Sequence, residues 1–171
     1  MFELVLGGSG SGKSEYAEEI FDDIYGLKYY IATMETHSEY AAERIKHHRK
    51  QRENRGFITI EKQTDIDEIF LEKKAEGIIL ECVSNLLANE MFGEKKDDKD
   101  TVKRILDSVI RLSYMADTLV VVTDDVFRDG MEYDGDTLRY ICYLSQINNE
   151  LAKRSDRVTE VIAGIPVNLK K

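Results

Sequence analysis

The most chemically specific segment of the chain is residues 7–14, which read Gly-Gly-Ser-Gly-Ser-Gly-Lys-Ser. They fit the pattern G-x-x-x-x-G-K-[ST], in which glycines let the backbone turn tightly and direct several N–H groups at one anion. Lys13 would reach the terminal phosphates of a nucleoside triphosphate, and the Ser14 hydroxyl would bind Mg²⁺. The residues predicted to contact the phosphates are Gly7, Gly8, Ser9, Gly10, Ser11, Gly12, Lys13 and Ser14.

The sequence around this loop predicts a strand before it and a helix after it. Residues 2–6 form a short apolar run. From Lys13 onward, apolar residues recur at helical spacing as far as Ile24. The loop should therefore cap the N-terminus of a helix, where free N–H groups favour an anion.

Further apolar runs alternate with helical patterns along the rest of the chain. They are residues 29–33, 57–60, 77–81, 119–123 and 160–163. Their continuous apolar character predicts strands that are buried on both faces. We therefore expect an α/β fold of the P-loop NTPase-like type, with a mostly parallel central sheet, helices on both faces and an edge strand after Pro166. Ligands of such sheets bind at the carboxyl ends of the strands.

Length and charge narrow the class of protein. The 171 residues suit one domain spanning 1–171. With 24 basic and 33 acidic residues, the net charge of −9 argues against nucleic acid or an anionic membrane as a partner. Cys82 and Cys142 show no metal or disulfide spacing, and no apolar run is long enough to span a membrane, which favours the cytoplasm.

A basic segment, residues 44–55, stands out in this acidic chain. Helical spacing places Arg44, His48, Arg52 and Arg55 on one face, beside a buried edge that includes Ile45. Positive neighbours favour the neutral imidazole of His48, whose free nitrogen could attack phosphorus. The alternative is a solvated basic helix face with incidental histidines.

Phosphoryl transfer also needs a carboxylate near Mg²⁺, typically at the end of an apolar strand. Glu81 ends one such strand, while Asp124 and Asp125 follow another. We favour Glu81, because the aspartate pair also fits a turn or a helix N-cap. Glu61 is a further polar residue at a strand end.

The ordered set of these segments resembles one family, the bifunctional adenosylcobinamide kinases and adenosylcobinamide-phosphate guanylyltransferases of cobalamin assembly. The resemblance spans nearly the whole chain, although the phosphate loop is its only specific piece. The matching segments are Gly7 to Ser14, Tyr30-Ile31-Ala32-Thr33, Arg44-Ile45-x-x-His48-Arg49 with Arg52, Glu61, Leu80-Glu81-Cys82 with Asn85 and Asn89, Val121-Val122-Thr123, Asn148, and Gly164-Ile165-Pro166-Val167-x-Leu169-Lys170.

The resemblance implies two reactions. A nucleoside triphosphate phosphorylates adenosylcobinamide, and GMP then passes from GTP to that phosphate through a guanylylated histidine. The family's nucleophile falls on His48, with His47 as the second candidate, and Lys13 and Glu81 would assist. GTP and ATP would be substrates, with Mg²⁺ as cofactor and a homo-oligomer as the assembly. The implied nucleotide contacts beyond the loop are Ala32, Thr33, Met34, Arg49, Lys50, Gln51, Arg52, Glu61 and Glu81.

Two other functions fit the phosphate loop. The first is a monofunctional small-molecule kinase, in which the basic segment binds an acidic substrate. The second is a nucleotide-responsive binding protein that catalyses no reaction. The chain departs from the family pattern mainly in its C-terminal half, for example at Asp124-Asp125-Val126-Phe127.

Overall fold

A seven-stranded sheet forms the centre of the computed structural model, which describes residues 1–35, 55–93, 100–126 and 133–171. The strand order is β3-β2-β4-β5-β1-β6-β7. All neighbouring strands are parallel except β6 and β7, which form an antiparallel hairpin at the edge. The strands are β1 (Phe2–Gly7), β2 (Lys28–Ala32), β3 (Phe57–Glu61), β4 (Ala75–Glu81), β5 (Ala116–Asp124), β6 (Arg157–Ile162) and β7 (Ile165–Lys170).

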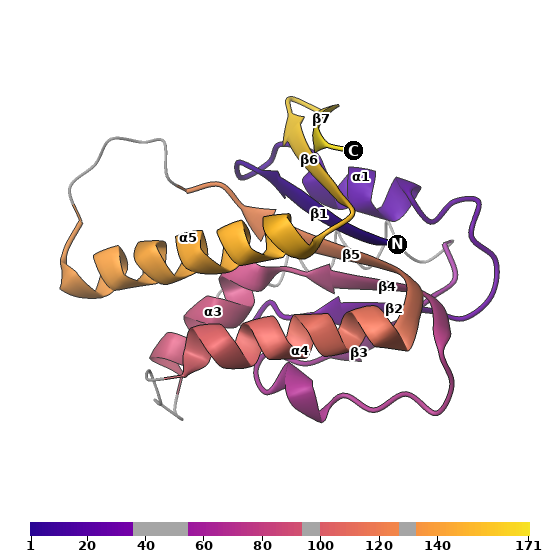
Figure 1. Ribbon diagram of the computed structural model, residues 1–171, viewed down its shortest axis with the longest axis horizontal. Helices are drawn as coiled ribbons and strands as arrows, with labels where there is room; N and C mark the ends of the chain where they lie inside the picture. Colours follow the sequence, from indigo (N-terminus) through magenta and orange to yellow (C-terminus); the bar gives the residue numbers. More distant parts are fainter. Residues whose placement is uncertain (36–54, 94–99, 127–132) are drawn as a thin grey trace.

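Helices cover both faces of this sheet, as Figure 1 shows, with α4 and α5 in front and α1 behind. The helices are α1 (Lys13–Glu19), α3 (Val83–Phe92), α4 (Thr101–Met115) and α5 (Gly135–Arg154), with a 3₁₀ turn η1 (Ile66–Glu68). The predicted α/β architecture is therefore confirmed. The predicted edge strand is β7, which begins at Ile165 and includes Pro166 rather than following it. In the part of the chain that the structure describes, no helix is long and apolar enough to cross a membrane.

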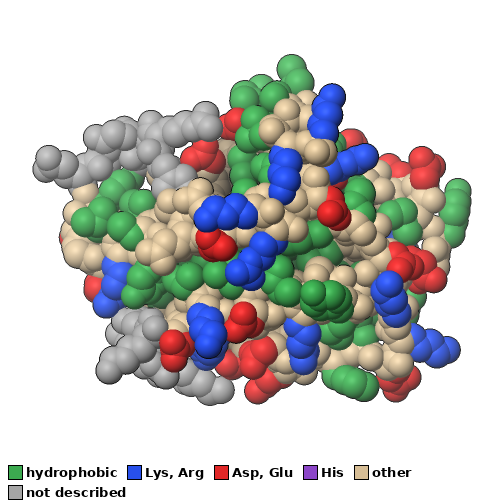
Figure 2. Space-filling view, in the orientation of Figure 1, with side chains coloured by type: hydrophobic (Ala, Val, Ile, Leu, Met, Phe, Trp, Pro, Cys, Tyr) green, Lys and Arg blue, Asp and Glu red, His purple; other side chains and the backbone are tan. Residues whose placement is uncertain are grey.

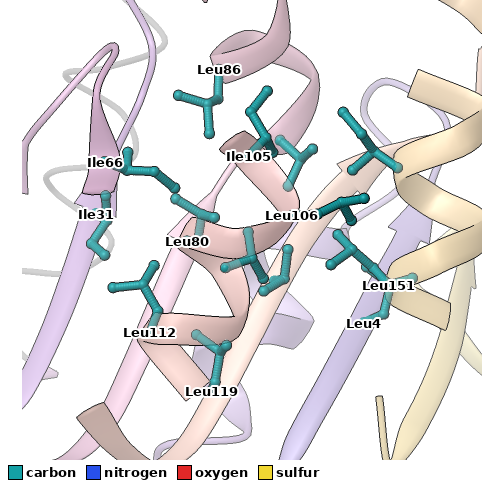
Figure 3. Packing of buried hydrophobic residues seen from close by; sticks show 14 of the residues in the cluster. Leu4, Ile31, Ile66, Leu80, Leu86, Ile105, Leu106, Leu112, Leu119 and Leu151 are labelled. Carbon is teal, nitrogen blue, oxygen red and sulfur yellow. The ribbon is translucent and has the colours of Figure 1, made fainter. Parts of the chain in front are cut away.

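The continuous apolar runs are explained by two separate cores. Leu4, Leu80 and Leu119 pack towards α3, α4 and α5 in the larger core (Figure 3). Their sequence neighbours, including Val5 and Val120, face α1 in the smaller core. Because successive strand residues point to opposite faces, burial of both faces requires apolar residues at every position.

The structure corrects two sequence expectations. Helix α1 ends at Glu19 rather than continuing to Ile24. Tight turns replace it, with the N–H of Ile24 donating to the carbonyl of Phe21, so the apolar spacing continues without the helix. Arg55 lies in a turn before β3 and pairs with Asp22 at 2.5 Å, so it does not belong to a basic helix face beside the predicted nucleotide.

Candidate functional site

The predicted site residues that the structure describes gather at the carboxyl edge of the sheet. Ala32 pairs with Glu61 on one side and with Glu81 on the other. Gly7, at the end of β1, pairs with Asp124 at the end of β5. Parallel strands therefore bring the phosphate loop and several carboxylates to one edge, although they are far apart in the sequence.

The phosphate loop joins β1 to α1 in a conformation that requires its glycines. Gly10 has a φ of 70° and Gly12 a φ of 92°, which are left-handed values that side chains disfavour. A side chain at Gly7 would lie 2.6 Å from both the Ser11 hydroxyl and the Val161 carbonyl. The loop thus reaches the N-terminus of α1 with the compact backbone that an anion-binding loop needs.

Lys13 is held over this loop by two contacts. Its Nζ donates to the carbonyl of Gly8 at 3.0 Å and forms an ion pair with Asp124 at 2.7 Å. Only 8% of Lys13 is exposed, so its charge needs a nearby counter-charge. A bound phosphate could take over that role from Asp124.

Ser14 and Glu81 form a second polar pair beside the first, in which the Ser14 hydroxyl donates to the Glu81 carboxylate. Burial raises the pKa of Glu81 to about 7, although the Ser14 hydrogen bond and the charge of Lys13 oppose the shift. Nearby Asp124 raises this pKa further. Near neutral pH, Glu81 therefore exchanges between its protonated and ionised forms.

The oxygen atoms of Ser14 and Glu81 suit Mg²⁺, which prefers hard oxygen ligands. The described residues include no group of three or more His, Cys, Asp or Glu side chains that could hold a metal ion. Protein sites for Mg²⁺ often use one or two side chains, with substrate phosphates and water completing the shell. The donor set of this edge fits that arrangement.

Thr33 holds the backbone on either side of the Glu81–Cys82 peptide bond through hydrogen bonds. Its side chain is fully buried, and its hydroxyl accepts from the N–H of Cys82 at 2.8 Å. The hydroxyl also lies within donor distance of the carbonyls of Glu81 and Cys82, at 3.0 and 2.9 Å. The backbone N–H of Thr33 donates to the Glu81 carbonyl as well. Thr33 thus fixes the Glu81–Cys82 peptide, which is cis, while Ala32 and Met34 on either side are partly exposed.

Two asparagine amides, one partly exposed and one buried, join the strand ends to the helices. Asn89 of α3 donates to the carbonyls of Thr33 and Gln63, at 2.8 and 3.0 Å. Asn148 of α5 accepts from the Thr123 hydroxyl at 2.8 Å and donates to the Asp124 carbonyl at 3.3 Å. Both asparagines had a place in the sequence resemblance but no assigned role.

Sequence reasoning ranked Asp124 below Glu81 and did not find its supporting residues. The Ser84 hydroxyl donates to Asp124, and the Cys82 sulfur lies 3.0 Å from the same hydroxyl. Tyr140 donates to the Ser84 carbonyl at 3.1 Å. Burial raises the pKa of Cys82 to about 12, so this cysteine stays a thiol. No sequence motif marks Ser84 or Tyr140, because their partners come from separate elements.

Two further predicted residues, Glu61 and Asp125, lie at the same edge of the sheet. Glu61 is exposed at the end of β3, and the N–H of Asp125 donates to the Gly7 carbonyl at 3.0 Å. The basic segment lies mostly outside the described residues. This holds for His47, His48, Arg49, Lys50, Gln51 and Arg52.

The fold and this edge together define a protein of the P-loop NTPase-like class. The KaiC-like protein PH0186 from Pyrococcus horikoshii OT3 shares the fold with a TM-score of 0.54. The match covers 93% of this chain and 69% of that chain at 12% identity.

The sequence pattern of the family described as cobinamide kinase / cobinamide phosphate guanyltransferase matches residues 3–169, so the chain belongs to this family of transferases. The bifunctional adenosylcobalamin biosynthesis protein CobU of Escherichia coli (strain K12) is 28% identical, over 99% of this chain and 100% of that protein. Its namesake from Salmonella typhimurium is 29% identical with the same coverage. The protein CobP of Pseudomonas aeruginosa is 24% identical over 99% of this chain and 98% of its own length. The resemblance drawn from the motifs is therefore confirmed.

The raised pKa of Glu81 predicts a pH-dependent stability difference. The folded protein holds the proton more tightly than the unfolded chain, so Glu81 lowers stability as the pH rises from the ordinary value of 4.5 to about 7. Glu81→Gln removes this titration. In the absence of nucleotide, we compare the free energy of unfolding of the variant with that of the wild type. We expect this difference to shift in favour of the variant by roughly 1–3 kcal/mol when the pH is raised from about 5 to about 8. Chemical denaturation measures this difference. An equal gain in the exposed control Glu72→Gln would contradict the assignment.

The position of Thr33 predicts a loss that depends on its hydroxyl. Thr33→Val leaves the buried N–H of Cys82 without its acceptor, and we expect the free energy of unfolding to fall by about 1–3 kcal/mol. Thr33→Ser keeps the hydroxyl and should recover most of that loss. Destabilisation by Thr33→Ser without destabilisation by Thr33→Val would show that the methyl group, rather than the hydrogen bonds, matters.

Proposed function

We propose that this protein phosphorylates adenosylcobinamide with a nucleoside triphosphate and then transfers GMP from GTP to the product through His48. The observation that carries the proposal is the convergence of the Lys13–Asp124 and Ser14–Glu81 pairs on a phosphate loop, in a chain of this family. The cytoplasm is the proposed location, and residues 1–171 the proposed domain.

In the nucleotide complex, the glycine-rich loop would hold the phosphates through its backbone N–H groups, from Gly7 to Ser14. Lys13 would leave Asp124 and bind a terminal phosphate oxygen. The Ser14 hydroxyl would give up its hydrogen bond to Glu81 and become a ligand of Mg²⁺. A bound Mg²⁺ would neutralise phosphate charge and align the reacting groups. Ala32, Met34 and Glu61 lie along the same edge and are the proposed contacts for the rest of the nucleotide. Thr33, which the sequence resemblance also gave as a contact, is fully buried and would act instead by holding the Glu81–Cys82 peptide.

In the kinase step, the hydroxyl oxygen of the aminopropanol arm attacks the γ-phosphorus. The bond from the γ-phosphorus to the bridging oxygen breaks, and the nucleoside diphosphate leaves. The hydroxyl proton passes to an ionised carboxylate or to water. Lys13 contributes by holding the charge of the transferred group, which is the main catalytic demand in phosphoryl transfer.

In the guanylyl step, a ring nitrogen of His48 attacks the α-phosphorus of GTP, and pyrophosphate leaves. A phosphate oxygen of adenosylcobinamide phosphate then attacks the same phosphorus and releases His48. A covalent intermediate divides one difficult displacement into two easier ones. Arg49, Lys50, Gln51 and Arg52 are the proposed nucleotide contacts nearby, and His47 is the alternative nucleophile.

We also propose a homo-oligomer. Ile162 and Ile165, at the tip of the β6–β7 hairpin, are 51% and 65% exposed. Exposed apolar residues that lie together favour burial against another surface.

The test of the guanylyl step is incubation with α-labelled GTP and Mg²⁺ without corrinoid, followed by denaturation. We expect acid-labile label on the wild type, and none above background on His48→Ala. The chain contains a matched control in His37→Ala, which should keep the label. Lys13→Ala should lower both labelling and the kinase step, because it removes the phosphate-binding cation.

Other outcomes would redirect the proposal. Label that is lost in His47→Ala and kept in His48→Ala would move the nucleophile by one residue. No label on the wild type, with GTP bound, would leave a monofunctional kinase or a nucleotide-responsive binding protein.

A further inference from the structure

A groove of about 810 Å³ lies beside the phosphate loop, on the face of the sheet that α5 covers only in part. Its wall on one side is the C-terminal half of α5, and on the other the strands β1, β6 and β7. Leu6, which immediately precedes the phosphate loop, lines it, whereas residues 8–14 do not. The groove is thus a neighbour of the phosphate site and not a part of it. Its volume is within the range of small-molecule sites, about 300–1,000 Å³.

The groove combines an apolar floor with a polar rim. Its apolar members are Leu6, Ala152, Val158 and Leu169. Asn149 and Lys153 on α5 and Asp125 after β5 supply the polar rim. The Lys170 side chain also lines the groove and is held in place, because its Nζ donates to the carbonyls of Ala152, Lys153 and Ser155 at 3.0, 2.9 and 2.6 Å.

The apolar side of the groove continues onto the hairpin surface. Figure 2, seen from the α4 and α5 side, shows exposed apolar side chains over β6 and β7 with basic (Lys or Arg) side chains beside them. Val167 is 40% exposed and Leu169 57%. A ligand larger than the groove could therefore extend over this apolar surface.

One end of the groove lies next to the phosphate loop. The N–H of Asp125 donates to the carbonyl of Gly7, the first residue of the phosphate loop. Asp124, next in the chain, pairs with Lys13, which is the proposed contact for the terminal phosphate. A ligand in the groove that extends past Asp125 would thus reach the side of the loop where the γ-phosphate is expected.

We infer that this groove binds the corrinoid substrate, with the edge of the macrocycle on the apolar floor and the aminopropanol arm directed past Asp125. This inference rests on the proposed function. A corrin ring has broad apolar faces and a rim of carboxamides, so it matches an apolar floor bordered by an amide and an ammonium group. A nucleotide would gain little from this groove, because its phosphates bind on the loop outside it.

The test uses one variant from each wall of the groove. Asn149→Arg places a long cation at the rim, and Leu169→Glu places a charge on the apolar floor, where its desolvation is costly. Each has a matched control at an exposed position outside the groove, Gln146→Arg on α5 and Ile58→Glu on β3. Equilibrium dialysis measures the affinity for adenosylcobinamide, and titration with a non-hydrolysable GTP analogue measures nucleotide affinity.

We expect both groove variants to weaken adenosylcobinamide binding by about tenfold or more, because each places a charge where the macrocycle would pack. Their nucleotide affinity should stay within about twofold of the wild type, because the phosphates bind on residues outside the groove. Both controls should match the wild type in the two measurements. The KM for adenosylcobinamide in the kinase reaction should rise in parallel.

Four results would overturn the inference. Groove variants that bind adenosylcobinamide like their controls would place the corrinoid elsewhere and leave the proposed function standing. A matching loss of nucleotide affinity would assign the groove to the nucleotide. A loss confined to Leu169→Glu, with an altered sedimentation coefficient, would assign the surface to subunit contact. If the wild type bound no adenosylcobinamide, the proposed function would fail together with the groove.

Discussion

The ion pair between Lys13 and Asp124 is the interaction on which the site depends. A lysine that is only 8% exposed requires a counter-charge, because an unpaired buried charge costs several kcal/mol. Asp124 supplies it from the strand next to β1, and Ser84 in turn holds Asp124. Because a phosphate would also satisfy Lys13, the electrostatic demand that pairs Lys13 with Asp124 also favours the binding of a phosphate group.

The other polar residues at this edge are joined to one another, and to the helices, by hydrogen bonds. Glu81 lies beside the Lys13–Asp124 pair and accepts a hydrogen bond from Ser14. Thr33 fixes the backbone next to Glu81, because its hydroxyl accepts from the N–H of Cys82. Asn89 and Asn148 join these strand ends to the helices behind them. Almost all of these contacts join residues that are far apart in the sequence. The parallel sheet therefore builds the proposed site, because its strand order brings these strand ends together.

Much of the fold could be predicted from the sequence, because strands buried on both faces need continuous apolar runs. The phosphate loop and Glu81 were also predictable, since a loop motif and strand ends are local signals. The pairing of Lys13 with Asp124 and the hydrogen bonds of Thr33 were not, because they depend on strand order and register. Helix α1 was predicted too long because apolar spacing continues through the turns around Phe21.

Our central proposal is that Ser14 and Glu81 would hold the Mg²⁺ that accompanies a nucleotide on this loop. The most direct measurement is calorimetric titration of a non-hydrolysable GTP analogue into the wild type and Glu81→Ala, each with and without Mg²⁺. The account predicts that Mg²⁺ strengthens binding to the wild type, and that Glu81→Ala keeps the metal-free affinity but loses most of this gain. An equal gain from Mg²⁺ in both proteins would contradict it.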